Sequence, residues 1–261
     1  EAKRIAKIFS DLDAKIEFNR KMNKTLESIA QAIFKRWFVD FEFPGYEKVK
    51  FVDGLPEGWK IRKLRDIFSI QHGFAFSGKD FTDNGDILVR MGNFETNGGL
   101  RFEQDNTKYC AIEVEGRFIL QAGDLVVVLS DITQKGLILG NPGIIPNDGK
   151  RYLLNQRVGK INLDKNIPLL FVYFLMLQEG YKAWVVNTAN STTVLNTSPD
   201  RIYGYQFLLP TENFMKKYEV AVVPLIREIF INFKENKKLT ELRDSLLPRL
   251  MVGKIRVNLR G

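Results

Sequence analysis

Histidine and cysteine, the side chains most used in catalytic and metal sites, are almost absent from this sequence. The 261 residues contain one histidine, His72, and one cysteine, Cys110. With a single histidine we expect no serine or cysteine triad. With a single cysteine we expect neither a disulfide framework nor a zinc–cysteine cluster, and no spaced acidic cluster compels a carboxylate metal site. Cys110 is expected to be a buried thiol.

Two short motifs come close to known signatures without completing them, and a third signature is absent. The segment Gly73–Lys79 satisfies the G-x-x-x-x-G-K part of a phosphate-binding loop, but Asp80 stands where a serine or threonine would bind Mg²⁺. Asp200 follows Pro199 with no Glu-x-Lys at nuclease spacing, and there is no Asn-Pro-Pro-Tyr-like run typical of an amino-methyltransferase. We expect the first motif to be structural. The side chains there that are expected to fill the core are Phe74, Phe76 and Phe81.

The net charge of +8 is unevenly distributed along the chain. Residues 1–40 carry nine Lys/Arg against six Asp/Glu, and residues 211–261 carry eleven against six. The middle, 41–210, is neutral, because 41–134 has an acidic excess of four and 135–210 a basic excess of four. A basic excess of this kind indicates a polyanionic partner. A solubilising surface charge is the open alternative.

Two long amphipathic helices are predicted at the two ends of the sequence. Apolar residues recur at three- and four-residue steps from Ala2 to about Trp37, with no proline or glycine between them. The same pattern returns 213 positions later (225 minus 12), where Leu12 coincides with Leu225. An internal repeat of this kind predicts two similar helices that pack antiparallel as a coiled coil.

Four asparagines interrupt the apolar stripes at equivalent positions of the repeat. Asn19 coincides with Asn232, and Asn23 coincides with Asn236. A polar residue in an apolar seam costs stability but fixes the register of the helices. We therefore expect these asparagines to pair the two helices; the open alternative places them in water at the edge of the stripe.

The predicted fold class is α+β: a globular α/β domain flanked by two long helices that form an antiparallel coiled coil. The expected domains are an N-terminal helix at 1–41, the globular domain at 42–210 and a C-terminal helix at 211–261. A buried strand is expected at 124–130 and a helix at 167–177. Further short strands are expected at 136–139, 143–145 and 156–161. Pro224 should kink or break the last helix.

Membrane insertion and secretion are not expected. No apolar run approaches the length of a membrane span, and the sequence begins without a signal-peptide pattern. We therefore expect a cytoplasmic protein with no membrane partner.

Seven segments, taken in order, resemble one known family. They are RIAKIFSDLDAKIEFNRKMNKTLESIAQAIFKRWFVDF (4–41), LPEGWKIRKL (55–64), HGFAFSGKDF (72–81), GDLVVVLSD (123–131), YLLNQRVGKI (152–161), NSTTVLNTSPDRI (190–202) and KLTELRDSLLPRLMVGKIRV (238–257). Together they resemble the specificity subunits of type I restriction-modification systems. The first segment is similar to the central conserved helix, the last to the distal conserved helix, and the others to a target recognition domain.

The resemblance implies a subunit in which two recognition domains, joined by antiparallel helices, each read half of a bipartite DNA site. This sequence has one such domain and both helices, so we expect either the C-terminal half of a longer subunit or a half-sized subunit that forms a homodimer through its helices. The resemblance also implies that modification subunits, which use S-adenosylmethionine, bind the helices, and that a restriction subunit uses ATP and Mg²⁺. This chain itself is expected to be non-catalytic and to hold no cofactor.

Residues that could contact double-stranded DNA follow from side-chain type and predicted loop position. The expected phosphate contacts are Lys79, Lys135, Lys150, Arg151 and Lys160. The expected base readers are Arg90, Asn93, Asn155, Gln156, Arg157, Ser191, Thr192 and Thr193. The open alternatives are solvated surface charges for the basic residues, bracing of strand ends for 155–157, and a solvent-facing loop for 187–198.

A function of a different class also stays open. The chain could be a helical assembly adaptor whose middle domain binds protein rather than DNA. DNA affinity that falls steeply with salt would favour DNA recognition over the adaptor.

Overall fold

The computed structural model describes residues 2–133, 135–191 and 194–251. Internal contacts divide the chain into two compact units. The helical unit comprises Glu1–Ile33 and Val220–Gly261, and the mixed unit comprises Phe34–Glu219. Each unit is described by itself below.

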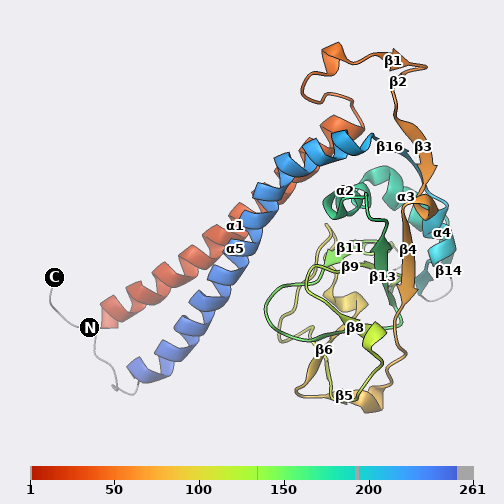
Figure 1. The fold of residues 1–261 in the computed structure, drawn as a ribbon. Coiled ribbons are helices and arrows are strands. Elements are labelled where there is room, and N and C mark those ends of the chain that lie inside the picture. Colours follow the sequence, from red (N-terminus) through yellow and green to blue (C-terminus); the bar gives the residue numbers. More distant parts are fainter. Residues whose placement is uncertain (1, 134, 192–193, 252–261) are drawn as a thin grey trace. The chain divides into compact units, whose positions relative to one another are not determined.

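The helical unit consists of most of α1 (Ala2–Phe38) and α5 (Glu212–Met251), which run antiparallel (Figure 1). The seam between them buries Ile16 and Ala30 of α1 and Ile229 of α5. The prediction of two long antiparallel helices is confirmed. Pro224 was expected to kink or break the last helix; it lies inside α5 without ending it, so the expectation of a break is wrong.

The mixed unit is built on two main sheets. Strands β11 (Pro142–Ile144), β9 (Leu125–Val128), β13 (Val158–Leu163) and β4 (Phe68–His72) form one, in that order. The other has the order β5 (Phe81–Thr82), β7 (Tyr109–Cys110), β6 (Asp86–Val89), β12 (Tyr152–Leu154) and β8 (Ile119–Leu120). Within it, β12 and β6 are parallel.

Three smaller sheets complete the strands of the mixed unit. One has the order β10 (Ser130–Asp131), β15 (Leu195–Asn196) and β14 (Asn190–Ser191). The others pair β16 (Gln206–Leu209) with β3 (Lys60–Lys63) and β1 (Phe51–Val52) with β2 (Leu55–Pro56). The helices are α2 (Leu169–Leu175), α3 (Glu179–Asn187) and α4 (Pro199–Tyr203).

The core of the mixed unit lies where side chains of the two main sheets meet. Val126 and Val158 from one sheet pack in a single cluster with Val89, Tyr152 and Leu154 from the other. The continuous apolar run 125–129 is explained by this position, because β9 is buried along its whole length. Cys110 is a buried free thiol.

Two local expectations differ from the structure. Residues 136–139 form bends and a turn instead of a strand. The strand expected at 156–161 begins at Val158 as β13, and a separate strand that was not expected, β12, precedes it. Contacts also assign 34–38 of α1 and 212–219 of α5 to the mixed unit. There the rings of Phe38 and Tyr218 have centroids 5.0 Å apart.

No single helix in the described residues is long and apolar enough to cross a membrane. Among the same residues, the bent pair α2 and α3 meets that length and composition jointly.

Candidate nucleic-acid interface

Four of the predicted DNA-contacting residues line one pocket in the mixed unit. The pocket has a volume of about 170 Å³. It is lined by Phe76, Phe81, Arg90, Met91, Asn155, Gln156 and Arg157. The lining therefore combines three apolar side chains with two guanidinium groups and two amides, and it contains no carboxylate.

Parallel pairing of β6 and β12 brings the two halves of this pocket together. Leu154 lies opposite Val89 in the ladder. Because the two strands run in the same direction, the residues that follow them, Arg90 and Asn155, emerge at the same edge of the sheet. Residues 91 and 156–157 continue the chain from that edge. This convergence depends on long-range pairing between segments about 65 positions apart (154 against 89).

The turn at 155–157 is fixed by contacts with the segment that follows β4. The Gln156 N–H donates to the Phe74 carbonyl at 2.9 Å, and the Phe74 N–H donates to the Leu154 carbonyl at 2.9 Å. Gly73 permits this approach, since a Cβ there would lie 2.2 Å from the Asn155 carbonyl oxygen. Gly73 is therefore required for packing, which explains the first glycine of the phosphate-loop-like motif without a nucleotide.

Asn155 braces this turn. It is 6% exposed, and its Oδ1 accepts a hydrogen bond from the Arg157 N–H at 3.2 Å. The bracing alternative therefore describes Asn155 better than base reading does. Gln156 is exposed and Arg157 half-buried, so both side chains remain accessible at the pocket.

Arg90 is held against an aromatic ring. Its guanidinium carbon lies 5.6 Å from the centroid of the Phe81 ring, a cation–π geometry. Phe81 is 38% exposed, so the expectation that it fills the core is wrong, whereas Phe76 is buried as expected. Neither Arg90 nor Arg157 forms an ion pair with any residue the structure describes.

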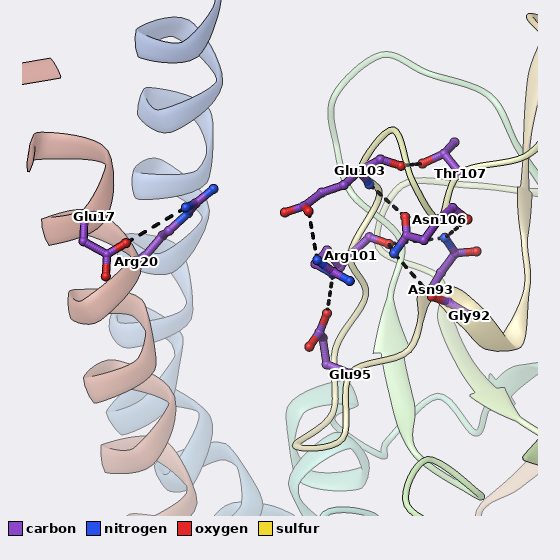
Figure 2. Close-up of polar contacts among 9 residues, drawn as sticks. All are labelled: Glu17, Arg20, Gly92, Asn93, Glu95, Arg101, Glu103, Asn106 and Thr107. Atoms are coloured by element: carbon purple, nitrogen blue, oxygen red, sulfur yellow. Dashed lines mark hydrogen bonds and ion pairs between the residues drawn. The ribbon is translucent and has the colours of Figure 1, made fainter. Parts of the chain in front are cut away.

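Asn93 belongs to the interior of the loop after β6. It is 1% exposed, and its Oδ1 accepts a hydrogen bond from the Arg90 N–H. Its Nδ2 donates to the carbonyls of Arg101 and Asn106 (Figure 2). Arg101 in turn bridges Glu95 and Glu103. Asn93 is therefore corrected from a base reader to a structural residue, because both ends of its amide are already used.

Three of the expected phosphate contacts are paired with carboxylates. Lys160 Nζ lies 2.6 Å from Asp124 Oδ2, with both side chains about four-fifths buried. Lys160 is therefore corrected to an internal tie. Arg151 lies 3.3 Å from Asp86, and Lys150 lies 3.9 Å from Asp148, but both basic side chains are about half exposed. These two pairs are weak enough to open for another anion.

Lys79 is exposed in the short 3₁₀ helix Gly78–Asp80. Asp80 accepts the Ser77 N–H at 2.6 Å and so caps that turn. The carboxylate that replaces the Mg²⁺-binding hydroxyl of a phosphate loop thus has a structural partner. Lys79 is left as a surface cation close in sequence to Phe81 of the pocket.

A second group of expected DNA contacts lies around the small sheet β10–β15–β14. Lys135 is exposed in the loop that follows β10, and Ser191 lies in β14. Thr192 and Thr193 lie outside the described residues. Ser130 Oγ donates to Asn196 Oδ1 at 2.7 Å, which ties β10 to β15. Of this group, neither Lys135 nor Ser191 lines the pocket.

The loop after β10 is anchored by one buried and one partly buried polar side chain. Asp131 accepts hydrogen bonds from the N–H groups of Thr133 and Ile138, and Lys182 Nζ donates to the Leu139 carbonyl at 2.8 Å and to Asn141 Oδ1. Burial lowers the pKa of Lys182 to about 8, against the opposing attraction of Asp131.

The four asparagines of the helical unit form a symmetric hydrogen-bonded set. Asn19 Nδ2 donates to Asn236 Oδ1 at 2.9 Å, and Asn232 Nδ2 donates to Asn23 Oδ1 at 2.8 Å. Asn23 also donates to the Ile229 carbonyl and Asn236 to the Ile16 carbonyl. Each bond is the counterpart of another under the repeat offset. The alternative that these side chains face water does not fit, since Asn19, Asn23 and Asn232 are buried.

In the described part of the chain, no group of three or more His, Cys, Asp or Glu side chains could hold a metal ion. Sequence reasoning missed the apolar lining of the pocket, notably Met91 and the exposed ring of Phe81. The only signal available for them was their position beside Arg90 and Lys79, which does not by itself separate a pocket wall from a core.

Comparisons with known proteins agree on one group. The family described as type I restriction modification DNA specificity domain matches residues 56–225. The specificity subunit of the HindI type I restriction enzyme of Haemophilus influenzae is 24% identical over 316 residues, covering 97% of this chain and 66% of that protein. The MjaIX specificity subunit of Methanocaldococcus jannaschii is 26% identical over 273 residues, covering 98% and 59%. The chain thus spans less than two thirds of these relatives.

Solved structures share the fold. The crystal structure of the type I restriction-modification S subunit from M. genitalium matches with a TM-score of 0.55 at 16% identity, covering 95% of this chain and 58% of that one. A chain from a study of type I restriction-modification assembly matches with a TM-score of 0.50 at 12% identity, covering 95% and 57%.

Proposed function

Because this chain belongs to the type I restriction-modification DNA specificity family, we propose that it recognises a DNA sequence on behalf of a type I restriction-modification complex. The observation that carries the proposal is the position of the family match. Residues 56–225 contain every residue expected to contact DNA, including the three accessible polar side chains of the pocket, Arg90, Gln156 and Arg157.

The basic residues of the mixed unit differ in whether a carboxylate is paired with them, and this difference suggests which of them contact phosphates. Exposed cations such as Lys79 and Lys135 can neutralise phosphates without first giving up a carboxylate partner. Arg151 and Lys150 can do so only by opening weak surface pairs. The pocket offers side chains that donate to base edges. One mixed unit of this size would read one half of a bipartite site, and a second recognition unit would read the other half.

We assign the helical unit to subunit assembly, on the basis of apolar residues outside its seam. Phe18 and Ile29 of α1 are 55% and 43% exposed, and their repeat counterparts Ile231 and Leu242 of α5 are 48% and 46% exposed. Exposed apolar side chains at helical spacing are typical of a docking surface. We propose that modification subunits dock there, or that a second copy pairs there. S-adenosylmethionine, ATP and Mg²⁺ would be bound by partner subunits, and this chain would be non-catalytic.

The test is DNA binding by the full chain together with the modification subunit, titrated between about 50 and 200 mM salt. We expect selective enrichment of particular duplexes from a random pool and a linear fall of log affinity with log salt. Binding of the modification subunit without any sequence preference for DNA would contradict the proposal and would favour a protein-binding adaptor.

A further inference from the structure

We propose that the pocket is the base-reading site of this chain, in which Arg90 and Arg157 read guanine and Gln156 reads adenine in the major groove. The inference rests on the DNA recognition proposed above and adds which residues supply specificity and which bases they select. An arginine fork matches the O6 and N7 acceptors of guanine, and a side-chain amide matches N6 and N7 of adenine.

The two arginines differ from several other basic residues of the mixed unit in what surrounds them. Arg101, Arg117, Arg151 and Lys160 each lie within ion-pair distance of an aspartate or glutamate. The pocket has no carboxylate in its lining, so its two guanidinium groups are not neutralised locally. Their hydrogen-bond donors are therefore available to an acceptor that enters the pocket.

Arg90 is oriented before any ligand arrives. Its backbone N–H is held by the buried Asn93 at 2.9 Å, and its guanidinium lies over the Phe81 ring. The first contact fixes the backbone and the second restricts the side chain, and neither uses the edge of the guanidinium plane. A fork held in this way loses less conformational entropy on binding, which favours discrimination between bases over a general attraction to phosphate.

Gln156 and Arg157 are presented by a turn whose backbone is fixed on both sides. Asn155 holds the Arg157 N–H, and the Phe74 carbonyl holds the Gln156 N–H. Two neighbouring polar side chains on a rigid turn suit contacts to adjacent base pairs. Specific contacts need this rigidity, because a bidentate pair is lost when its donors are displaced.

The apolar wall gives the pocket a second selective feature. Phe81 presents an exposed ring, and Met91 is half-buried beside Arg90. An apolar surface next to a hydrogen-bonding fork favours a thymine methyl group and excludes water from the polar contacts. The pocket thus combines a donor edge with an apolar wall, which matches a base edge better than it matches a phosphate group alone.

The experiment selects duplexes from a random pool with the full chain and its modification subunit, and compares the enriched sequence of the wild-type protein with those of Arg157→Lys and Arg90→Lys. Lysine keeps the charge but loses the fork. We expect each variant to lose about tenfold of its preference at one G·C position, with less than about twofold change in affinity for unselected DNA. Gln156→Leu should relax a neighbouring A·T position, and Phe81→Leu should relax the position read by Arg90.

Arg117→Lys is the matched control, since Arg117 is an exposed arginine of the same unit that is paired with Glu115 and has no expected DNA contact. It should leave the enriched sequence unchanged. If the wild-type chain selects a sequence and all four pocket variants select the same one with equal stringency, the pocket is not the reading site, although DNA recognition stands. If the wild-type chain selects no sequence, the proposed function fails and the inference fails with it.

Discussion

The seam of the helical unit and the pocket of the mixed unit both gather polar side chains against apolar ones, but they use them in opposite ways. In the seam, Asn19 donates to Asn236 and Asn23 accepts from Asn232, so these amides find their partners inside the chain. In the pocket, neither Arg90 nor Arg157 is paired with a carboxylate of any residue that the structure describes. Side chains satisfied internally fix a structure, whereas side chains held in place with open donors are suited to a ligand.

The largest expected effect concerns the seam. Asn232→Leu removes the partner of Asn23 and leaves a buried amide unsatisfied, so the free energy of unfolding should fall by about 2–3 kcal/mol. The double variant Asn23→Leu/Asn232→Leu removes both amides and should recover most of that loss. Denaturant unfolding followed by helical circular dichroism measures both. A double variant as unstable as the sum of the single variants would show that the pair does not act as a unit.

The outer surface of the same helices should respond differently. Phe18→Ser and Ile231→Ser should leave the free energy of unfolding within about 0.5 kcal/mol of the wild type, because both side chains are half exposed. Each should weaken binding of the modification subunit by about 2 kcal/mol, measured by calorimetry. Lys24→Ser, at an exposed polar position of α1, is the control. Equal binding by all three variants would place the docking surface elsewhere.

A smaller effect is expected in the loop after β10. Lys182→Met leaves the Leu139 carbonyl and Asn141 Oδ1 without their donor and should lower the free energy of unfolding by about 1–2 kcal/mol. The pKa of Lys182 is lowered from 10.5 to about 8, so between these values the unfolded chain binds a proton that the folded chain has released. Stability of the wild type relative to Lys182→Met should therefore rise with pH from about 8 to 10. A flat difference would contradict the burial of the charged amine.

The smallest effect on stability is expected at Lys79. Because it is exposed and caps nothing, Lys79→Ala should change the free energy of unfolding by less than about 0.5 kcal/mol. If it contacts a phosphate, the slope of log affinity against log salt should become less steep by about one, equally for all sequences. Titrations on selected and unselected duplexes measure this, and an unchanged slope would remove Lys79 from the interface.

The sequence predicted the helical unit better than the pocket, for a physical reason. The helix seam follows from local periodicity and a repeat, and the asparagine register could be counted along the chain. The pocket depends on the parallel pairing of β6 with β12, which no local pattern specifies. Asn93 and Lys160 were misassigned because residue type alone does not reveal that an amide or an ammonium group has an internal partner.

Phe81 and Asn155 also show that residue type alone does not reveal the role of a side chain. Both stand next to polar or basic residues, yet Phe81 is a wall exposed to the pocket and Asn155 is a buried brace. Their roles are set by which strand end lies beside them, and that is decided by tertiary pairing rather than by composition. The resemblance of the segments in order gave the family, but it could not assign individual side chains.

Amide hydrogen exchange of the full chain with and without a selected duplex, measured beside an unselected one, tests the contrast between the two units most directly. We expect protection by the selected duplex at 90–91 and 155–157, little protection there by the unselected duplex, and no sequence-dependent change in the seam around Asn19 and Asn232. Sequence-dependent protection confined to α1 and α5, with 90–91 and 155–157 unchanged, would contradict this expectation.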